Sequence, residues 1–100
     1  MKIMLIGAAG QLGADLAKAL PGRTTVPLTH ADIEITDSRS VGRAFERHRP
    51  DVVINTAAFH RVDDCETEME RAFQVNAFAV RGLAQARRHF GAALVHFSTG

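Results

Sequence analysis

Three glycines at a three-residue spacing follow directly on a short apolar run near the start of the chain. The run spans Ile3 to Ile6, and the glycines are Gly7, Gly10 and Gly13. Behind them, leucines recur every four residues, which is typical of one face of a helix. A buried strand, a glycine-rich turn and a helix in this order form the first half of a βαβ unit. Such a turn either cradles a phosphate or serves as a structural connection.

The rest of the chain repeats the alternation of apolar runs and helical spacing. We predict further strands at 24–28, 51–54 and 93–97 from runs without polar alternation. The first helix runs from Gly10 to Leu20. A second, N-capped by Asp37, ends at Pro50, and a third runs from a capping box at Thr67 and Glu70 to Gly91. The order β-α-β-α-β-α-β predicts an α/β fold with a parallel sheet and helices on both faces. We expect one domain over residues 1–100.

Composition narrows the function classes. A net charge of +1 gives no electrostatic case for binding nucleic acid or an anionic membrane. No apolar run approaches the ~18 residues of a membrane span. The single cysteine, Cys65, has no C-x-x-C partner, so we expect no metal site and a reducing, cytoplasmic setting. The basic cluster from Arg87 to His89 reads as a solvated helix face.

Each glycine of the first motif has a physical task in a phosphate-binding turn. Gly7 allows a tight turn off the strand, Gly10 allows backbone to approach a pyrophosphate, and Gly13 allows close packing of the helix. The N–H groups and the positive dipole end of the helix attract phosphate. Because no Gly-Lys-Ser/Thr follows, an ATP or GTP P-loop is excluded. The G-x-x-G-x-x-G spacing favours a Rossmann-type dinucleotide site, of which the chain supplies the first four strands.

Six segments along the chain carry a more specific likeness: "GAAGQLG", "ITDSRSV", "RPDVVINTAAF", "VDDCE", "AFQVNAFAVRGLA" and "LVHFST". In this order and spacing the chain resembles the dTDP-4-dehydrorhamnose reductases of the extended short-chain dehydrogenase/reductase superfamily. The likeness covers nearly the whole chain. It implies a nicotinamide cofactor, NADPH or NADH, and a nucleotide-sugar substrate.

The resemblance assigns cofactor contacts by position. The residues implied at the pyrophosphate are Gly7, Gly10, Gln11, Leu12 and Gly13. Glu34 and Ile35 are implied beside the adenine and its ribose. The remaining cofactor-binding positions are Ala57, Ala58, Phe59, Asn76 and Phe97. Asn76 has two interpretations, a structural hydrogen bond or a relay behind a catalytic lysine, and Asp63 with Glu66 matches the family's "VDxxE".

The family's chemistry uses a Ser/Thr at the end of the fourth strand and a later Tyr-x-x-x-Lys pair. Ser98 and Thr99 match the first element, and Thr99 is implied to orient the sugar carbonyl. The chain contains no tyrosine, and Gly100 stands where the family usually has Asp. We therefore expect the proton donor and the substrate domain beyond residue 100, and no catalysis by residues 1–100 alone. His96 is expected to point into the packing of the sheet.

The expected function is NAD(P)H-dependent reduction of dTDP-4-dehydro-L-rhamnose to dTDP-L-rhamnose by the full-length enzyme, with a homodimer as its assembly. Two alternatives stay open. One is a nucleotide-sugar epimerase or dehydratase of the same superfamily. The other is a non-catalytic NADP-binding regulatory subunit, similar to the β-subunit of methionine adenosyltransferase. The choice between NAD and NADP also stays open, because Leu28, Thr29 and His30 close the second strand with neither an acid nor an arginine.

Overall fold

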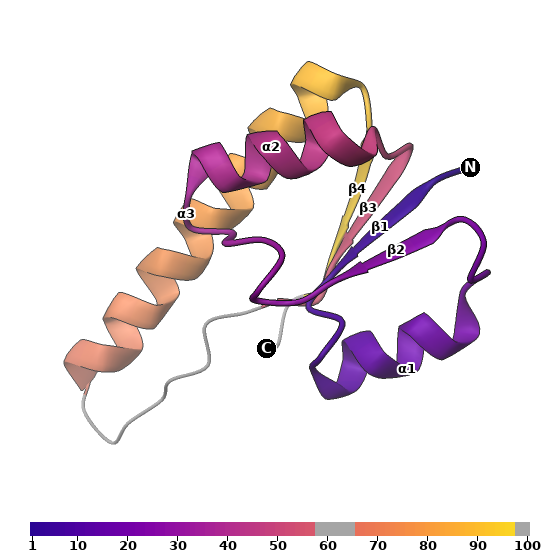
Figure 1. Cartoon of the computed structure of the whole chain (residues 1–100). Coiled ribbons are helices and arrows are strands. Elements are labelled where there is room, and N and C mark those ends of the chain that lie inside the picture. The colour runs from indigo at the N-terminus through magenta and orange to yellow at the C-terminus, as the bar shows by residue number, and fades with distance from the viewer. Residues whose placement is uncertain (58–65, 98–100) are drawn as a thin grey trace.

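The computed structural model of the chain describes residues 1–57 and 66–97, with the side chains of residues 66–76 outside that description. Strands and helices alternate along the chain, as the sequence predicted (Figure 1). The strands are β1 (Ile3–Ile6), β2 (Thr25–Leu28), β3 (Val52–Asn55) and β4 (Ala93–His96). The helices are α1 (Gln11–Ala19), α2 (Ser38–His48) and α3 (Glu66–Phe90). Across the described residues, no helix combines the length and apolar composition needed to cross a membrane.

All strand pairs are parallel, and their order across the sheet is β2-β1-β3-β4. The register aligns Ile6 with Leu28 on one side and with Asn55 on the other, and Asn55 with His96. The strands therefore end in one row at a single edge. The chain adds β2 on one side of β1 and then crosses back to add β3 on the other side. The direction in which strands are added therefore reverses between β1 and β3.

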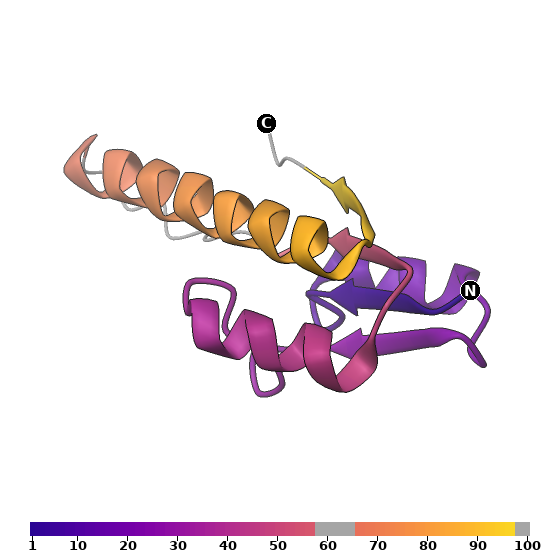
Figure 2. The ribbon, with the colours of Figure 1, turned by 90° about the horizontal axis from the view of Figure 1, so that it is seen from above.

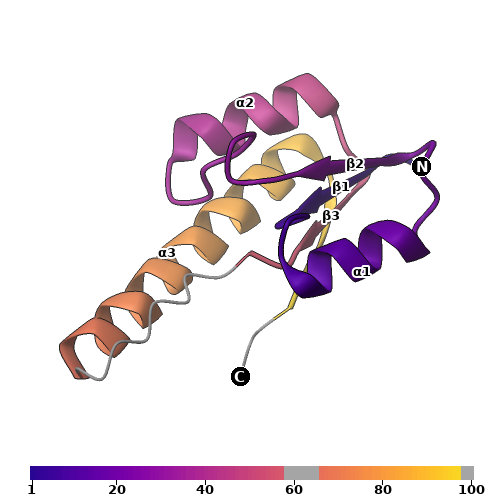
Figure 3. The ribbon, with the colours of Figure 1, turned by 60° about the horizontal axis from the view of Figure 1, so that its bottom comes forward.

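Helices cover both faces of the sheet, which confirms the expected Rossmann-type layering. In Figure 1, α2 lies above the strands, α3 runs along their left side up to α2, and α1 lies below the strands; Figure 2 shows α2 and α3 side by side, and Figure 3 brings α1 in front of the strands. The main hydrophobic cluster consists of Met4, Ile6, Leu28, Ile33, Val41, Ala44, Phe45, Val53, Leu83 and Ala92. Phe45 of α2 stacks on Phe90 of α3 with ring centroids 5.6 Å apart. Leu5, also fully buried, alternates with Met4 and Ile6 and therefore faces the α1 side.

Helix ends follow the local sequence signals, with one correction. The Asp37 side chain accepts a hydrogen bond from the Arg39 backbone N–H at 3.0 Å, which confirms the predicted N-cap of α2. Arg49 adopts a left-handed conformation with φ of 45° and ends α2 before Pro50. The predicted cap at Thr67 is wrong in position, because α3 already includes Glu66. Apolar periodicity defines the body of a helix better than its first turn.

Strand bounds differ from the predictions by one residue. β3 extends to Asn55, a polar residue that the apolar pattern excluded, because the pairing with Ile6 and His96 continues through it. β2 begins at Thr25, and β4 ends at His96. β2 lies at an edge of the sheet and contains Pro27, which is paired in register with Leu5.

Candidate functional site

The carboxyl ends of the strands meet at one edge of the sheet, where the chain reverses direction between β1 and β3. Gly7 follows β1, Thr56 follows β3 and Phe97 follows β4. In open α/β sheets, ligands bind in the crevice outside such a reversal. This edge is therefore the place to look for the cofactor contacts that the sequence predicted.

Gly7 is required by the fold itself. Its φ is +88°, a conformation that side chains rarely adopt. A Cβ there would collide with the Thr56 hydroxyl and lie 2.8 Å from the Ala57 nitrogen. The Gly7 and Ala8 backbone N–H groups both donate to the Leu28 carbonyl oxygen at 3.0 Å. The first turn of the motif is thus tied to β2 and pressed against the end of β3.

Gly13 is also required by the fold, although its neighbour differs from the one predicted. It is buried in α1, and a Cβ there would collide with the Gly7 carbonyl oxygen and lie 3.0 Å from the Ala8 Cα atom. The close approach is therefore between α1 and the glycine turn, where the sequence predicted one between α1 and the sheet. This contact holds the N-terminus of α1 directly against the turn.

Gly10 differs from the other two glycines because nothing in the fold demands it. Its φ and ψ are −74° and 167°, which any residue adopts, and a Cβ would meet only the Gly7 carbonyl oxygen, at 3.5 Å. Gly10 is the N-cap of α1, so a side chain at this position would stand at the N-terminus of that helix. A glycine that leaves such a space open fits a backbone that must lie close to a ligand.

The first turn of α1 offers the hydrogen-bond donors that a phosphate needs. Gly10 is the N-cap and supplies no side-chain acceptor, and the first turn contains no acidic residue. In the described part of the chain, the N–H groups of Gln11, Leu12 and Gly13 have no acceptor. Unpaired N–H groups at the positive end of a helix bind anions, so the residues present fit a pyrophosphate. Gln11 and Leu12 are both exposed, with 42% of Leu12 accessible.

Glu34 and Ile35, the pair predicted beside the adenosine, follow β2, and their side chains lie in different surroundings. Glu34 is exposed, and its carboxylate Oε1 accepts from the Thr36 hydroxyl at 2.7 Å and from the Thr36 N–H at 3.3 Å. The Glu34 N–H in turn donates to the Ser40 hydroxyl at 2.8 Å. Ile35 packs against the main hydrophobic cluster. Glu34 is therefore the member of the pair that a ligand can reach.

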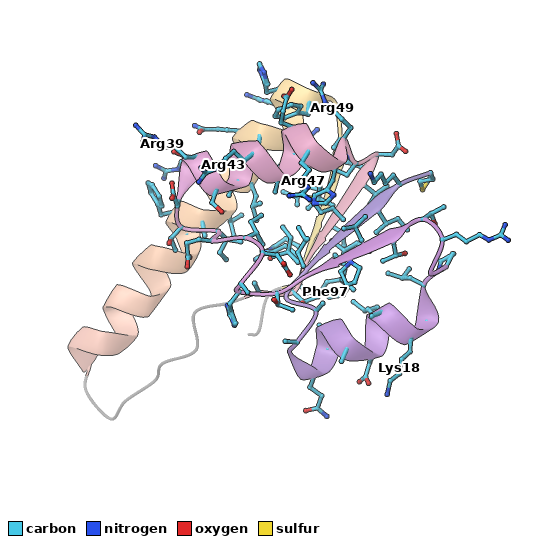
Figure 4. The ribbon with its side chains drawn as sticks, viewed as in Figure 1. Lys18, Arg39, Arg43, Arg47, Arg49 and Phe97 are labelled. Atoms are coloured by element: carbon cyan, nitrogen blue, oxygen red, sulfur yellow. The ribbon has the colours of Figure 1, made fainter. Side chains whose placement is uncertain are left out.

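On the other side of the reversal, Ala57 and Phe97 lie beside Asn55. The Ala57 N–H donates to the Asn55 side-chain oxygen at 3.1 Å, and the Phe97 N–H donates to the Asn55 carbonyl oxygen at 3.0 Å. Phe97 is 37% exposed and lies by the converging strand ends (Figure 4). The other predicted residues lie outside the described part of the chain: Ala58, Phe59, Ser98, Thr99 and the side chain of Asn76.

Asn55 is the residue of this edge that the sequence analysis missed. Its side chain is fully buried, and it bonds to the His96 ring Nδ1 at 3.0 Å. The available signal was a single amide closing an otherwise apolar strand, since a buried amide must find partners. The prediction that His96 points into the sheet packing is wrong. In the part of the chain that the structure describes, the His96 side chain is exposed, and its ring bonds back to Asn55.

A hollow of about 490 Å³ lies between α2 and the end of β2, and three of its lining residues are basic. Arg43, Arg47 and His48 of α2 border it together with Leu28 and Asp32. Figure 4 shows Arg43 and Arg47 along α2, on the side of the sheet opposite α1. In the sequence, no arginine lies directly after the second strand. The fold supplies two, because α2 runs back along the sheet.

The pKa values of two groups that line this hollow, His48 and Asp32, are lowered by their surroundings. Burial, with the nearby positive charges of Lys2 and Arg47, lowers the pKa of His48 below its usual range. Hydrogen bonds from the Thr29 N–H at 2.8 Å and the Thr29 hydroxyl at 3.0 Å lower the pKa of Asp32. At neutral pH the hollow therefore holds two guanidinium groups, a neutral imidazole and one carboxylate that is engaged by Thr29.

Comparison with known proteins identifies the family to which this chain belongs. Residues 1–100 match the family described as the RmlD substrate binding domain. The chain is 41% identical over 98 residues to the Streptomyces griseus dTDP-4-dehydrorhamnose reductase, covering 96% of this chain and 32% of that protein. It is 39% identical over 100 residues to the Bacillus subtilis spore coat polysaccharide biosynthesis protein SpsK, covering 98% and 35%.

A solved structure shows the same arrangement of elements. The Bacillus anthracis dTDP-4-dehydrorhamnose reductase, crystallised in complex with NADP, superposes with a TM-score of 0.82 and 33% identity. The superposition covers 94% of this chain and 35% of that chain. The present chain spans about a third of the length of the curated relatives that it matches. The chain belongs to the RmlD substrate binding domain family, the family of the dTDP-4-dehydrorhamnose reductases to which it is similar.

Proposed function

We propose that residues 1–100 are the N-terminal, cofactor-binding part of an NAD(P)H-dependent reductase of 4-keto nucleotide-sugars. The substrate that the family favours is dTDP-4-dehydro-L-rhamnose, reduced to dTDP-L-rhamnose. The observation that carries the proposal is the contrast among the three glycines. The fold needs Gly7 and Gly13, whereas Gly10 leaves open the space that a pyrophosphate would fill.

The arrangement of the strand ends gives the bound dinucleotide a direction. Its pyrophosphate would lie at the N-terminus of α1, between β1 and β3. The adenosine half would extend over the end of β2, toward Glu34. The nicotinamide half would then lie over the ends of β3 and β4, near Phe97, where Ser98 and Thr99 follow. This direction is the one expected for a dinucleotide bound across the reversal of a Rossmann-type sheet.

The reduction needs a hydride and a proton at one carbonyl group. The nicotinamide supplies the hydride to the carbonyl carbon, and the carbonyl oxygen must receive a proton from an acid. In our proposal Thr99 and Ser98 hydrogen-bond that oxygen and orient the sugar. The family's donor is a tyrosine, and the chain has none, so the donor belongs to a further part of the protein. Residues 1–100 bind cofactor without turning over substrate.

We further propose NADPH as the preferred cofactor. Arg43 and Arg47 border the hollow beside Leu28, at the end of the strand over which the adenosine ribose would lie. An arginine near this point accommodates the 2′-phosphate of NADP. The two guanidinium groups outnumber the one carboxylate that lines the hollow, Asp32, which accepts hydrogen bonds from Thr29. The NADP complex of the Bacillus anthracis relative supports the same choice.

Cofactor titration tests the proposal directly. NADPH and NADH are titrated into the protein and followed by fluorescence, with ATP as the comparison nucleotide. We expect saturable binding of both dinucleotides, tighter for NADPH, and much weaker binding of ATP. Absence of dinucleotide binding by the folded protein would refute the proposal. Turnover of a keto nucleotide-sugar by residues 1–100 alone would refute the assignment of the proton donor to another part.

A further inference from the structure

The hollow beside α2 is built from one continuous segment of the chain. All of its lining residues lie between Leu28 and His48, and the structure describes this segment throughout. Two neighbouring rows of α2 border it, since residues four apart lie on one face of a helix. Arg43 and Arg47 form one row, and Ser40 and His48 belong to the other. His48 therefore faces the same space as the two guanidinium groups.

His48 is the group of this hollow whose charge changes near neutral pH. It is the last residue of α2 and is half-buried. Burial lowers its pKa, and so do the positive charges of Lys2, which precedes β1, and of Arg47, whereas Asp32, which follows β2, acts in the opposite direction. From α3, the uncharged ring of Phe90 packs against this end of α2. The imidazole is therefore neutral at pH 7.

A phosphate group in the hollow would reverse this balance of charge. A phosphate monoester carries about two negative charges at neutral pH. An opposite charge close to an imidazole favours its protonated form and raises its pKa by about one unit or more. The protonated ring donates from both nitrogens, whereas the neutral ring donates from one. A bound phosphate would therefore gain a third positive charge and a further donor, beside Arg43 and Arg47.

We infer that His48 binds the 2′-phosphate of NADPH together with Arg43 and Arg47, and that its ring takes up a proton from solvent when this phosphate binds. NADH carries a hydroxyl group in place of the phosphate and leaves the ring neutral. The inference rests on the proposed function, since it takes NADPH as the ligand. It adds a selectivity for NADPH over NADH that increases as the pH falls below neutral.

Titration of the His48 ring in the wild-type protein tests the inference. ¹H–¹³C spectra follow the ring Cε1–H group of each histidine against pH, with His48 identified through its assigned backbone. With saturating NADPH we expect the pKa of His48 to rise by about one unit, and with saturating NADH to stay unchanged. His89, which does not line the hollow, is the internal control. An equal rise with both cofactors, or none with NADPH, would overturn the inference.

The Gly10 amide separates this failure from failure of the proposed function. NADPH and NADH both carry the pyrophosphate, so both should shift its resonance. If neither does, the proposed function fails; if both do and NADPH leaves the pKa of His48 unchanged, only the present inference fails. Inorganic phosphate at the concentration of NADPH should leave the pKa of His48 unchanged. A rise with inorganic phosphate would make the hollow a general anion site and remove its link to the dinucleotide.

The variant His48→Gln tests the contribution to affinity. Because NADPH binding takes up a proton, the Kd for NADPH should fall relative to that for NADH as the pH drops. We expect the ratio of the two Kd values in the wild type to increase about three- to fivefold from about pH 7.5 to about pH 6. The phosphate itself titrates near pH 6, and His48→Gln keeps that titration while it loses the imidazole. An equal pH dependence of the ratio in both proteins would overturn the role of His48.

Discussion

The Thr56 hydroxyl donates to the Ile6 carbonyl oxygen at 2.8 Å and thereby joins the end of β3 to the end of β1. The same hydroxyl lies 3.2 Å from the Gly7 carbonyl oxygen. One side chain thus closes the reversal point of the sheet and fixes the turn from which the glycine motif starts. The cradle proposed for the cofactor therefore depends on a residue outside the glycine motif itself.

Replacing Thr56 with valine should destabilise the fold. The variant keeps the shape of the side chain and loses the donor, so two carbonyl oxygens at the turn lose a partner. We expect the free energy of unfolding to fall by about 1 kcal/mol, measured by denaturant titration. Thr56→Ser keeps the hydroxyl and is the matched control. Equal stability of Thr56→Val and the wild type would contradict this account of the turn.

Substitution of Gly10 should affect cofactor binding, whereas substitution of Gly13 should affect the stability of the fold. Gly10→Val should still fold, because a Cβ fits there, and should lose more than about tenfold in NADPH affinity. Gly13→Ala should instead lower the melting temperature, because its Cβ meets the Gly7 carbonyl oxygen. Thermal unfolding and fluorescence titration of both variants check the pair. NADPH affinity unchanged in folded Gly10→Val would mean that the loop is only structural.

Cofactor preference should depend on the basic hollow beside β2. The double variant Arg43→Gln/Arg47→Gln should weaken NADPH binding by about tenfold and leave NADH binding nearly unchanged, because only NADPH carries the 2′-phosphate. Arg39→Gln, one turn earlier on α2, is the control, since Arg39 does not line this hollow. Parallel titrations with both cofactors give the comparison. Equal losses for NADH and NADPH would remove these arginines from cofactor selection.

Acid should destabilise the fold partly through His48. Its pKa is lowered in the folded state, so the unfolded chain binds the proton more readily. The free energy of unfolding is therefore highest above the unfolded pKa and falls as the pH drops from about 7.5 to about 5. His48→Gln should flatten this part of the stability profile, whereas His30→Gln, at an exposed position, serves as the control. A profile of equal slope in His48→Gln and wild type would contradict the effect.

Local sequence signals were sufficient for the elements and for the glycine motif. The apolar run of β1 and the Asp37 cap of α2 lie where the sequence placed them, because each depends on neighbours a few residues away. The family resemblance assigned the site residues by position, and their roles stay predictions. The different demands on Gly10 and Gly13 were not predictable, since they follow from how closely α1 approaches the Gly7 carbonyl.

What the sequence could not supply depends on pairing across the fold. Asn55 and His96 lie 41 residues apart, and only the register of β3 with β4 brings them together. Arg43 and Arg47 reach the end of β2 only because α2 runs back along the sheet. Neither relationship leaves a periodic trace in the chain, so both required the three-dimensional arrangement.

Pro27 interrupts the row of backbone donors along the outer side of β2, the outermost strand of the sheet in the described residues. The Thr24 and Leu28 carbonyl oxygens accept hydrogen bonds from the Ile3 and Gly7 N–H groups, on the β1 side. Because backbone groups alternate in direction along a strand, those of Thr25 and Pro27 point away from β1. An exposed strand edge is a template on which another strand can add, and repeated addition leads to aggregation. Proline has no N–H group, so a new strand would find a donor missing in the middle of this four-residue edge. We therefore expect Pro27→Val to keep the fold and to raise the tendency of the protein to aggregate at high concentration.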